Sequence, residues 1–307
     1  MRIVIQFAII HGHIWVIIYQ KSIAVKIIHN ILVPTDFSDC AENAYQFSLR
    51  LADKWKSSVK LLHVVSPDYG VTDLPVIVDL ATKEKIDIAL QLLHAFKDIG
   101  LSKAKPELQA EPKVTDEVKI SGLPYAAINT VAEEEETDLI VVGTKSNHSA
   151  WENAFGTNAA QVVKKSPCHV LVVPEGASFK GFPMVGFAAD LHETDPYHLW
   201  KACKILEPYH SIIRCAHIEK EGKANESKLR IEELKEFFAN NPIALQISFH
   251  TLEEASIEIG LEAFANEWDL DLLVMTSPHR DVFGQLFHKS MTKQMALHSK
   301  IPLLVMK

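Results

Sequence analysis

Two short stretches of this sequence carry residue types that suit a phosphate or a sugar. Pro34-Thr35-Asp36 offers a carboxylate directly after an apolar run, and a glycine loop runs from Gly143 through Ser146 to Gly156-Thr157. Glycine lets a backbone approach a phosphate closely, and the free N–H groups where a helix begins attract anions. A carboxylate can accept hydrogen bonds from a ribose or a base. These residue types are suited to a nucleotide site.

The same residues also have a plain structural interpretation. Both glycines can serve tight turns, and Asp36 can cap the helix that follows it. From the residues alone this structural interpretation is the stronger of the two. The sequence also lacks the GxxxxGK[ST] phosphate loop, and no GxGxxG motif follows the first predicted strand.

The surrounding elements would place both loops on one edge of a sheet. Apolar runs predict strands at residues 27–33, 59–65, 111–120, 139–142 and 168–173. Helical spacing predicts a helix opened by Ser38, a second over residues 78–99 that stops at Gly100, and a third from Pro124. Such alternation is typical of a parallel sheet covered by helices on both faces, where ligands bind outside the carboxyl ends of the strands.

This pattern occurs twice along the chain. The run Asp138-Leu-Ile-Val-Val matches Asp271-Leu-Leu-Val-Met, and His169-Val-Leu-Val matches Pro302-Leu-Leu-Val; 271 − 138 and 302 − 169 both give 133. Further strands are predicted at residues 184–189, 212–218 and 244–249. Two tandem α/β domains of one fold follow, with a Gly- and Pro-rich linker near residues 174–183.

The segments KIIHNILVPTDFSDCAENA, LLHVV and DLIVVGTKSNHSAWENAFGTNAAQVVKKSPCHVLVVP resemble the universal stress protein family. The resemblance covers residues from about 26 to 307 as a tandem pair, which sets the domains at 26–174 and 182–307. It implies two doubly wound, five-stranded parallel sheets of the adenine nucleotide alpha hydrolase-like fold. In the nucleotide-binding branch of the family, a G-x2-G-x9-G-[S/T] loop holds ATP phosphates and an aspartate after the first strand lies near the adenine.

The family's motif is carried over only in part. Asp36 matches the aspartate, Gly143 the first glycine, and Gly156-Thr157 the closing pair, whereas Ser146 replaces the middle glycine. ATP with Mg²⁺ is therefore the ligand that the resemblance implies for the first domain, with no separate metal site and no catalytic residue. Its expected contacts are Pro34, Thr35, Asp36, Val64, Val142, Gly143, Ser146, Gly156, Thr157 and Asn158.

The second domain departs further from the motif. The matching stretch reads Thr276-Ser-Pro-His and ends at Lys289-Ser290, so all three glycines are gone, although Asp190 is kept. We expect this copy to be structural and to pair with the first copy as a pseudo-dimer. The terminal strands CHVLVV and PLLVM should be paired rather than left as apolar edges. Whether two chains also form a homodimer stays open.

Composition limits the remaining function classes. Apolar residues make up 48% of the 307 residues and charged residues 23%, which is typical of a globular protein. The net charge of −8 argues against nucleic acid as a partner. Four cysteines without CxxC spacing favour reduced thiols, and we expect a cytoplasmic protein.

Residues 1–25 stand apart from this pattern. The apolar run at residues 3–19 is shorter than the roughly 20 residues of a membrane span and contains a glutamine and two histidines. We consider a non-native extension from a misassigned start, a membrane-associating tail and a signal peptide, and expect no membrane association of the folded unit.

Three functions remain in competition at this point. The first is a stress-response binding protein, not an enzyme, whose first domain binds ATP and which acts through unknown protein partners. The second is a scaffold that binds no nucleotide. The third is a weak ATPase, although no residue is positioned by the sequence to activate water.

Overall fold

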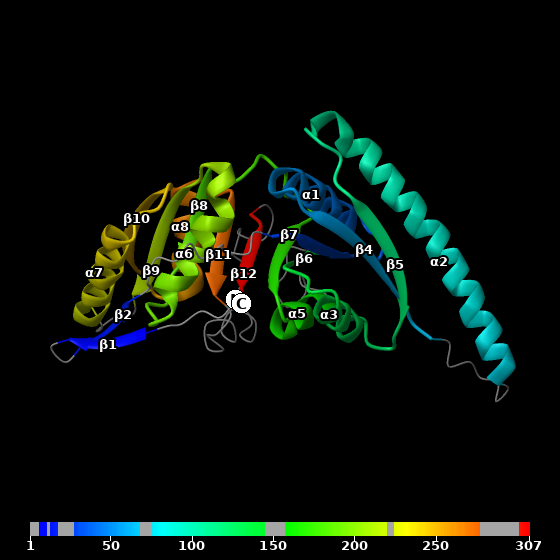
Figure 1. Ribbon diagram of the computed structural model, residues 1–307, viewed down its shortest axis with the longest axis horizontal. Helices are drawn as coiled ribbons and strands as arrows, with labels where there is room; N and C mark the ends of the chain where they lie inside the picture. The colour runs from blue at the N-terminus through cyan, green and yellow to red at the C-terminus, as the bar shows by residue number, and fades with distance from the viewer. Residues whose placement is uncertain are drawn as a thin grey trace.

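One ten-stranded sheet organises the protein (Figure 1). The computed structural model describes residues 6–10, 13–17, 28–67, 75–144, 157–219, 224–276 and 301–307. The strand order is β10-β9-β8-β11-β12-β7-β6-β3-β4-β5. All neighbouring strands run parallel except the pair at the centre, β12 and β7.

The first copy supplies five parallel strands whose order shows double winding. They are β3 (Asn30–Pro34), β4 (Ser58–Val65), β5 (Val114–Ile120), β6 (Leu139–Thr144) and β7 (His169–Pro174). The chain starts in the middle with β3, moves outward to β4 and β5, and then crosses to β6 and β7 on the other side. The strand order therefore reverses between β3 and β6, which is the switch point of this half.

The second copy repeats this order strand for strand. Its strands are β8 (Met184–Ala188), β9 (Ile212–Glu219), β10 (Gln246–Glu253), β11 (Leu272–Thr276) and β12 (Leu303–Met306). The five predicted strands of each half are confirmed, with ends that differ from the prediction by a few residues.

The two halves join through their last strands. β12 runs antiparallel to β7, and Leu304 lies opposite Leu171 in a register of three residue pairs. The expectation that these apolar strands pair within the chain is confirmed. The pairing fuses the two predicted five-stranded sheets into one and leaves β5 and β10 as its outer strands.

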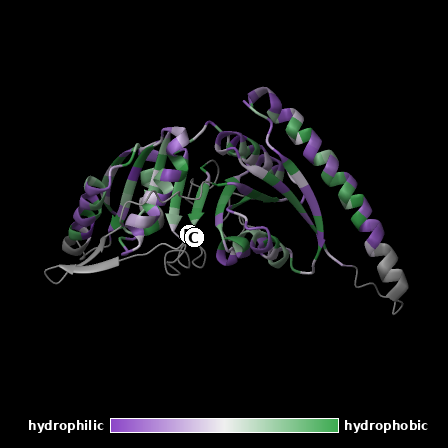
Figure 2. Cartoon of the chain, viewed as in Figure 1, coloured by the Kyte–Doolittle hydropathy of each residue, from purple (hydrophilic) through white to green (hydrophobic). Residues whose placement is uncertain are grey.

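Helices cover both faces of the sheet and enclose two apolar clusters (Figure 2). One face carries α1 (Asp39–Trp55), α2 (Pro75–Ala104), α6 (Asp195–Leu206) and α7 (Ala224–Asn240). The other carries α3 (Pro124–Glu134), α5 (Thr157–Lys165) and α8 (Ile257–Glu267). Two short 3-10 turns follow α2 and α6, at Lys105–Glu107 and Glu207–Tyr209.

Helix α1 begins where the sequence predicts. Ser38 is its N-cap, and the Ser38 Oγ accepts a hydrogen bond from the Ala41 N–H at 3.4 Å. This bond satisfies one of the donors that every helix leaves open at its first turn.

The predicted stop of the second helix at Gly100 is wrong, because α2 continues to Ala104. A Cβ on Gly100 would lie 2.3 Å from Cε1 of Tyr45, so the glycine is needed for close packing of α2 on α1. The Gln46 Nε2 donates to the Gly100 carbonyl at 3.0 Å across the same contact. In the sequence, a glycine that ends a helix cannot be told from a glycine that allows close packing near the end of a helix.

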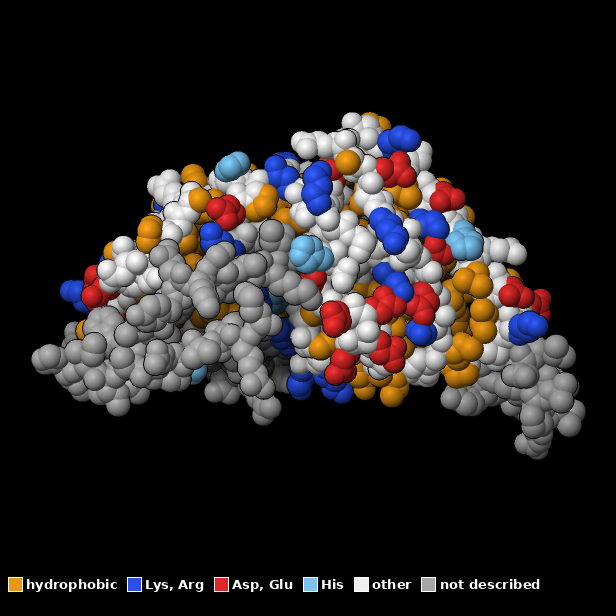
Figure 3. All heavy atoms as spheres, in the orientation of Figure 1, with side chains coloured by type: hydrophobic (Ala, Val, Ile, Leu, Met, Phe, Trp, Pro, Cys, Tyr) orange, Lys and Arg blue, Asp and Glu red, His pale blue; other side chains and the backbone are white. Residues whose placement is uncertain are grey.

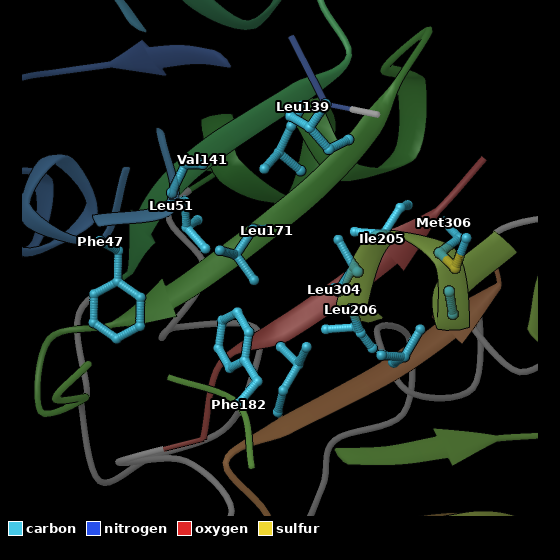
Figure 4. Close-up of a cluster of buried hydrophobic side chains, with 14 of the residues drawn as sticks. Phe47, Leu51, Leu139, Val141, Leu171, Phe182, Ile205, Leu206, Leu304 and Met306 are labelled. Atoms are coloured by element: carbon cyan, nitrogen blue, oxygen red, sulfur yellow. The ribbon is translucent and has the colours of Figure 1, made fainter. Parts of the chain in front are cut away.

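Contacts between the halves extend beyond the strand pair. The Trp55 Nε1–H donates to the carbonyl of Ile205 at 3.0 Å, and the Trp55 ring packs edge-on against Tyr209. Phe182 from the linker lies between side chains of both copies (Figure 4). The linker therefore contributes to the shared core.

Both copies also repeat the same backbone turns. Phe37 and Leu191, each the third residue after the first strand of its copy, have φ angles of 65° and 58°. Left-handed φ is uncommon for residues other than glycine, so its recurrence at matching positions supports duplication of one fold.

The apolar N-terminal stretch contains two short paired strands. Strands β1 (Gln6–Ile10) and β2 (His13–Ile17) pair antiparallel as a separate two-stranded sheet. Within the described residues, no helix combines the length and the apolar character that crossing a membrane requires.

A buried histidine lies at the join of the two halves. His169 starts β7, and its Nδ1 accepts a hydrogen bond from the backbone N–H of Lys307 at 3.0 Å. Burial lowers the pKa of His169 to about 3, and the positive charge of Lys201 acts in the same direction. Only the unprotonated Nδ1 can accept this bond, so the contact depends on a neutral imidazole.

Acid should therefore destabilise the folded chain through His169. The unfolded chain binds a proton here below about pH 6.5, whereas the folded chain does so only near pH 3. The contribution of His169 to the free energy of unfolding is complete above pH 6.5. It falls by at most about 1.4 kcal/mol per pH unit as the pH is lowered toward 3. Urea unfolding at several pH values should show a smaller loss in His169→Gln, which keeps an acceptor but cannot titrate. Equal pH dependence in both proteins would contradict this role.

Candidate functional site

The predicted site residues of the first copy gather where the strand order reverses. β3 and β6 are neighbours there, and the next described helices along the chain, α1 and α5, lie on opposite faces of the sheet (Figure 1). Pro34 ends β3, Val64 is the penultimate residue of β4, and Val142 and Gly143 lie near the end of β6. The structure thus brings these residues to one edge of the sheet.

The loop after β3 is held by several hydrogen bonds. The Thr35 N–H donates to the carbonyl of Leu62 at 2.9 Å, and the Phe37 N–H donates to the Thr35 Oγ1 at 3.0 Å. His63 Nδ1 lies 2.8 Å from the Thr35 carbonyl oxygen, and its ring packs 4.4 Å from that of Phe37. These contacts fix the path of the backbone on both sides of Asp36.

Asp36 is exposed and has a structural role in this loop. Its Oδ1 accepts hydrogen bonds from the N–H of Ser38, at 3.1 Å, and from the Ser38 hydroxyl. The prediction that Asp36 caps α1 is wrong, because Ser38 is the N-cap and Asp36 supports the start of the helix only through Ser38. Its Oδ2 has no hydrogen-bond partner in the described part of the chain, so one carboxylate oxygen remains available to a ligand.

Gly143 is required by the packing of β6 on α1. A Cβ at this position would lie 2.1 Å from the carbonyl oxygen of Cys40 and 2.9 Å from the nitrogen of Ala41. Both atoms belong to the backbone of the first turn of α1 and cannot rotate away. The glycine therefore has a structural cause that is independent of any phosphate.

The remaining predicted residues follow β6 in the chain, up to the first turn of α5. Thr157 is the first residue of α5, and Asn158 is exposed in its first turn. Ser146 and Gly156 lie outside the described residues. Thr144, the last residue of β6, is buried, and its carbonyl accepts a hydrogen bond from the N–H of Glu175 at 2.9 Å.

His63 is a site residue that the sequence analysis did not single out. The same contact exists in the second copy, where His217 Nδ1 lies 3.0 Å from the carbonyl oxygen of Ala189. The signal is present in the sequence, since the run LLHVV of the first copy aligns with CAHIE of the second and places the two histidines at one position. A histidine repeated at one position of both copies indicates a shared structural contact more strongly than a histidine found in one copy alone.

The second copy keeps the aspartate loop. Asp190 is exposed after β8, and Leu191 has the left-handed backbone of Phe37. In the parts of both copies that the structure describes, no cluster of His, Cys, Asp and Glu could hold a metal ion.

The fold defines a class of protein, that of tandem doubly wound α/β domains. In each copy the loop after the first strand, β3 or β8, has the same left-handed residue and the same histidine contact. A comparison with protein families gives the particular family. The model of the "Universal stress protein family" matches residues 28–174 and 210–307, which is well over half of the chain. The chain belongs to the universal stress protein family.

Individual relatives agree with this membership. Universal stress protein MJ0531 of Methanocaldococcus jannaschii is 27% identical over 143 residues, which cover 47% of this chain and 80% of the relative. Universal stress protein MJ0577 of the same organism is 30% identical over 166 residues, which cover 47% of this chain and 93% of the relative. A universal stress protein structure from Archaeoglobus fulgidus superposes over 92% of this chain and 97% of its own, with a TM-score of 0.64 and 14% identity. This last likeness concerns the fold alone.

Substitution of Gly143 should destabilise the fold strongly. In Gly143→Ala the new methyl group meets the Cys40 backbone, and we expect a loss of about 3 kcal/mol or more in the free energy of unfolding. Gly186→Ala is a matched control on β8, because its Cβ would meet side-chain atoms of Leu270 and Phe264 that can shift. We expect Gly186→Ala to lose less free energy of unfolding than Gly143→Ala. Chemical denaturation measures both, and an equal or smaller loss in Gly143→Ala would contradict the packing role.

Proposed function

We propose that this chain is a stress-response binding protein whose first copy binds ATP or a related adenine nucleotide, with Mg²⁺. The observation that carries the proposal is the meeting of the Asp36 loop and the Gly143 strand end at the switch point of the first half. Ligands of doubly wound sheets bind at such an edge. The partly kept G-x2-S-x9-G-T motif points to a phosphate group.

The residues present fit such a ligand. Asp36 offers a carboxylate oxygen without a partner for the sugar or base, and the segment from Gly143 to Asn158 would hold the phosphates. Pro34, Thr35, Val64 and Val142 would line the base-binding side. Bound Mg²⁺ would neutralise phosphate charge. No residue is assigned to activate water, so we propose a binding protein rather than an enzyme, in the cytoplasm.

The second copy would serve the pair structurally. It supplies β12 to the central strand pair and keeps Asp190 without a glycine loop after β11. The protein would then act through protein partners as a tandem pseudo-dimer.

A non-binding scaffold is the main alternative, and two observations favour it. Gly143 is explained by packing alone, and Ser146 replaces the glycine of the motif. A weak ATPase has no such support from the described residues.

Matched substitutions in the two copies test the nucleotide proposal. Isothermal titration of the full chain with Mg²⁺–ATP should show binding by one copy. Asp36→Asn keeps the acceptor for the Ser38 N–H but loses the charge, and we expect binding about tenfold weaker, which corresponds to about 1.4 kcal/mol. Asp190→Asn makes the same change in the second copy and should leave binding unchanged. Absence of heat at millimolar nucleotide would refute the proposal.

Substitution of Ser146 separates the binding protein from the scaffold. If a Cβ at this position only hinders a phosphate, Ser146→Gly should tighten an affinity that the parent chain already has. Binding that arises only in Ser146→Gly would instead support the scaffold. Thermal unfolding with and without Mg²⁺–ATP measures this, because a ligand of the folded state raises its stability.

A further inference from the structure

A basic residue occupies the same position in both copies. Lys60 is the third residue of β4, and Arg214 is the third residue of β9. Their partners across the neighbouring strand also match, since Lys60 lies opposite Thr115 on β5 and Arg214 lies opposite Ser248 on β10. Both residues lie toward the amino ends of their strands, away from the candidate nucleotide site.

In the first copy, carboxylates neutralise this cation. The Lys60 Nζ forms ion pairs with Glu117, at 3.0 Å, and with Glu135. Burial opposes the charged amine, but the hydrogen bonds to Glu135 and Glu117 outweigh it and raise the pKa of Lys60. Acidic and basic side chains gather together over α3 and the lower part of β5 (Figure 3).

In the second copy, both carboxylates are replaced. His250 lies two residues beyond Ser248 on β10, as Glu117 lies two residues beyond Thr115 on β5. Trp268 is the C-cap of α8, as Glu135 is the C-cap of α3. The second copy therefore has the cation without the two acidic partners of the first copy.

Arg214 is held in place by neutral groups instead. Its guanidinium carbon lies 4.3 Å from the centre of the Trp268 ring, and its Nη1 donates to the Ser248 Oγ at 2.8 Å. Ser248 Oγ in turn lies 2.8 Å from His250 Nε2. Burial lowers the pKa of His250, and the charge of Arg214 acts in the same direction, so the imidazole is neutral near pH 7.

The guanidinium is incompletely satisfied. Its Nε is enclosed and has no hydrogen-bond partner, and no carboxylate of the described residues forms an ion pair with Arg214. A partly buried cation without a counter-charge is unfavourable, and arginine presents donors in a fork that matches the oxygens of a carboxylate or a phosphate.

We propose that Arg214, Ser248 and Trp268 form a binding site for the carboxylate or phosphate group of a small anionic ligand. The anion supplies the negative charge that Glu117 and Glu135 provide in the first copy. Trp268 and Ser248 pre-orient the guanidinium, which lowers the entropy lost on binding. The site is independent of the nucleotide proposal.

NMR of the arginine side chains tests this site directly. The chain has five arginines, so the Nε–H spectrum is simple and Arg214→Lys assigns the peak of Arg214. At constant ionic strength, inorganic phosphate or acetate should shift that peak in a saturable manner at millimolar concentration. A shift with acetate alone identifies a carboxylate site and a shift with phosphate alone a phosphate site. No saturable shift with either anion overturns the proposal.

Restoring the first copy's pattern gives a second test. His250→Glu with Trp268→Glu supplies internal carboxylates, keeps Arg214, and should weaken anion binding about tenfold or more. Asp36→Asn should leave the Arg214 shift unchanged, which separates this site from the nucleotide site. Undiminished binding in the double variant would overturn the proposal.

Discussion

The antiparallel pairing of β7 with β12 is the contact on which the whole architecture depends. Without it each half would end in a strand of buried apolar residues with unpaired backbone groups. With it, one sheet runs through both copies and a single apolar cluster on the α1 and α6 face includes residues of both. The ladder itself is short, at three residue pairs, so the packing of Trp55, Phe182 and Tyr209 beside it is needed to hold the halves together.

Much of this fold could be predicted because its signals are local or repeated. Ser38 begins α1 as a capping residue should, and the constant spacing between copies located β11 and β12 from β6 and β7. The prediction at Gly100 is wrong because the cause of that glycine is distant in the chain: only the ring of Tyr45 explains why a side chain is excluded there. Neither the spacing of residues nor the composition predicts the contact between Gly100 and Tyr45.

The candidate site shows the same division between local and distant causes. The structural role of Asp36 is local, since its hydrogen bonds to Ser38 span only two positions, although the helix cap is Ser38 and not Asp36. The reason for Gly143 lies in the backbone of Cys40, about a hundred positions earlier, and no sequence pattern predicts it. Positions such as Gly143 can serve packing and ligand binding together, so a motif glycine alone is weak support for a ligand.

The covalent link between the copies changes what their association depends on. Two separate chains that met through three residue pairs would come apart on dilution. A linker of about ten residues, near residues 174–183, instead keeps each half at a millimolar effective concentration of the other. Association of the halves is then insensitive to how much protein a cell makes. Each half can also carry its own side chains, so the acidic partners of Lys60 have no counterpart around Arg214, whereas two identical chains would have the same residues in both halves.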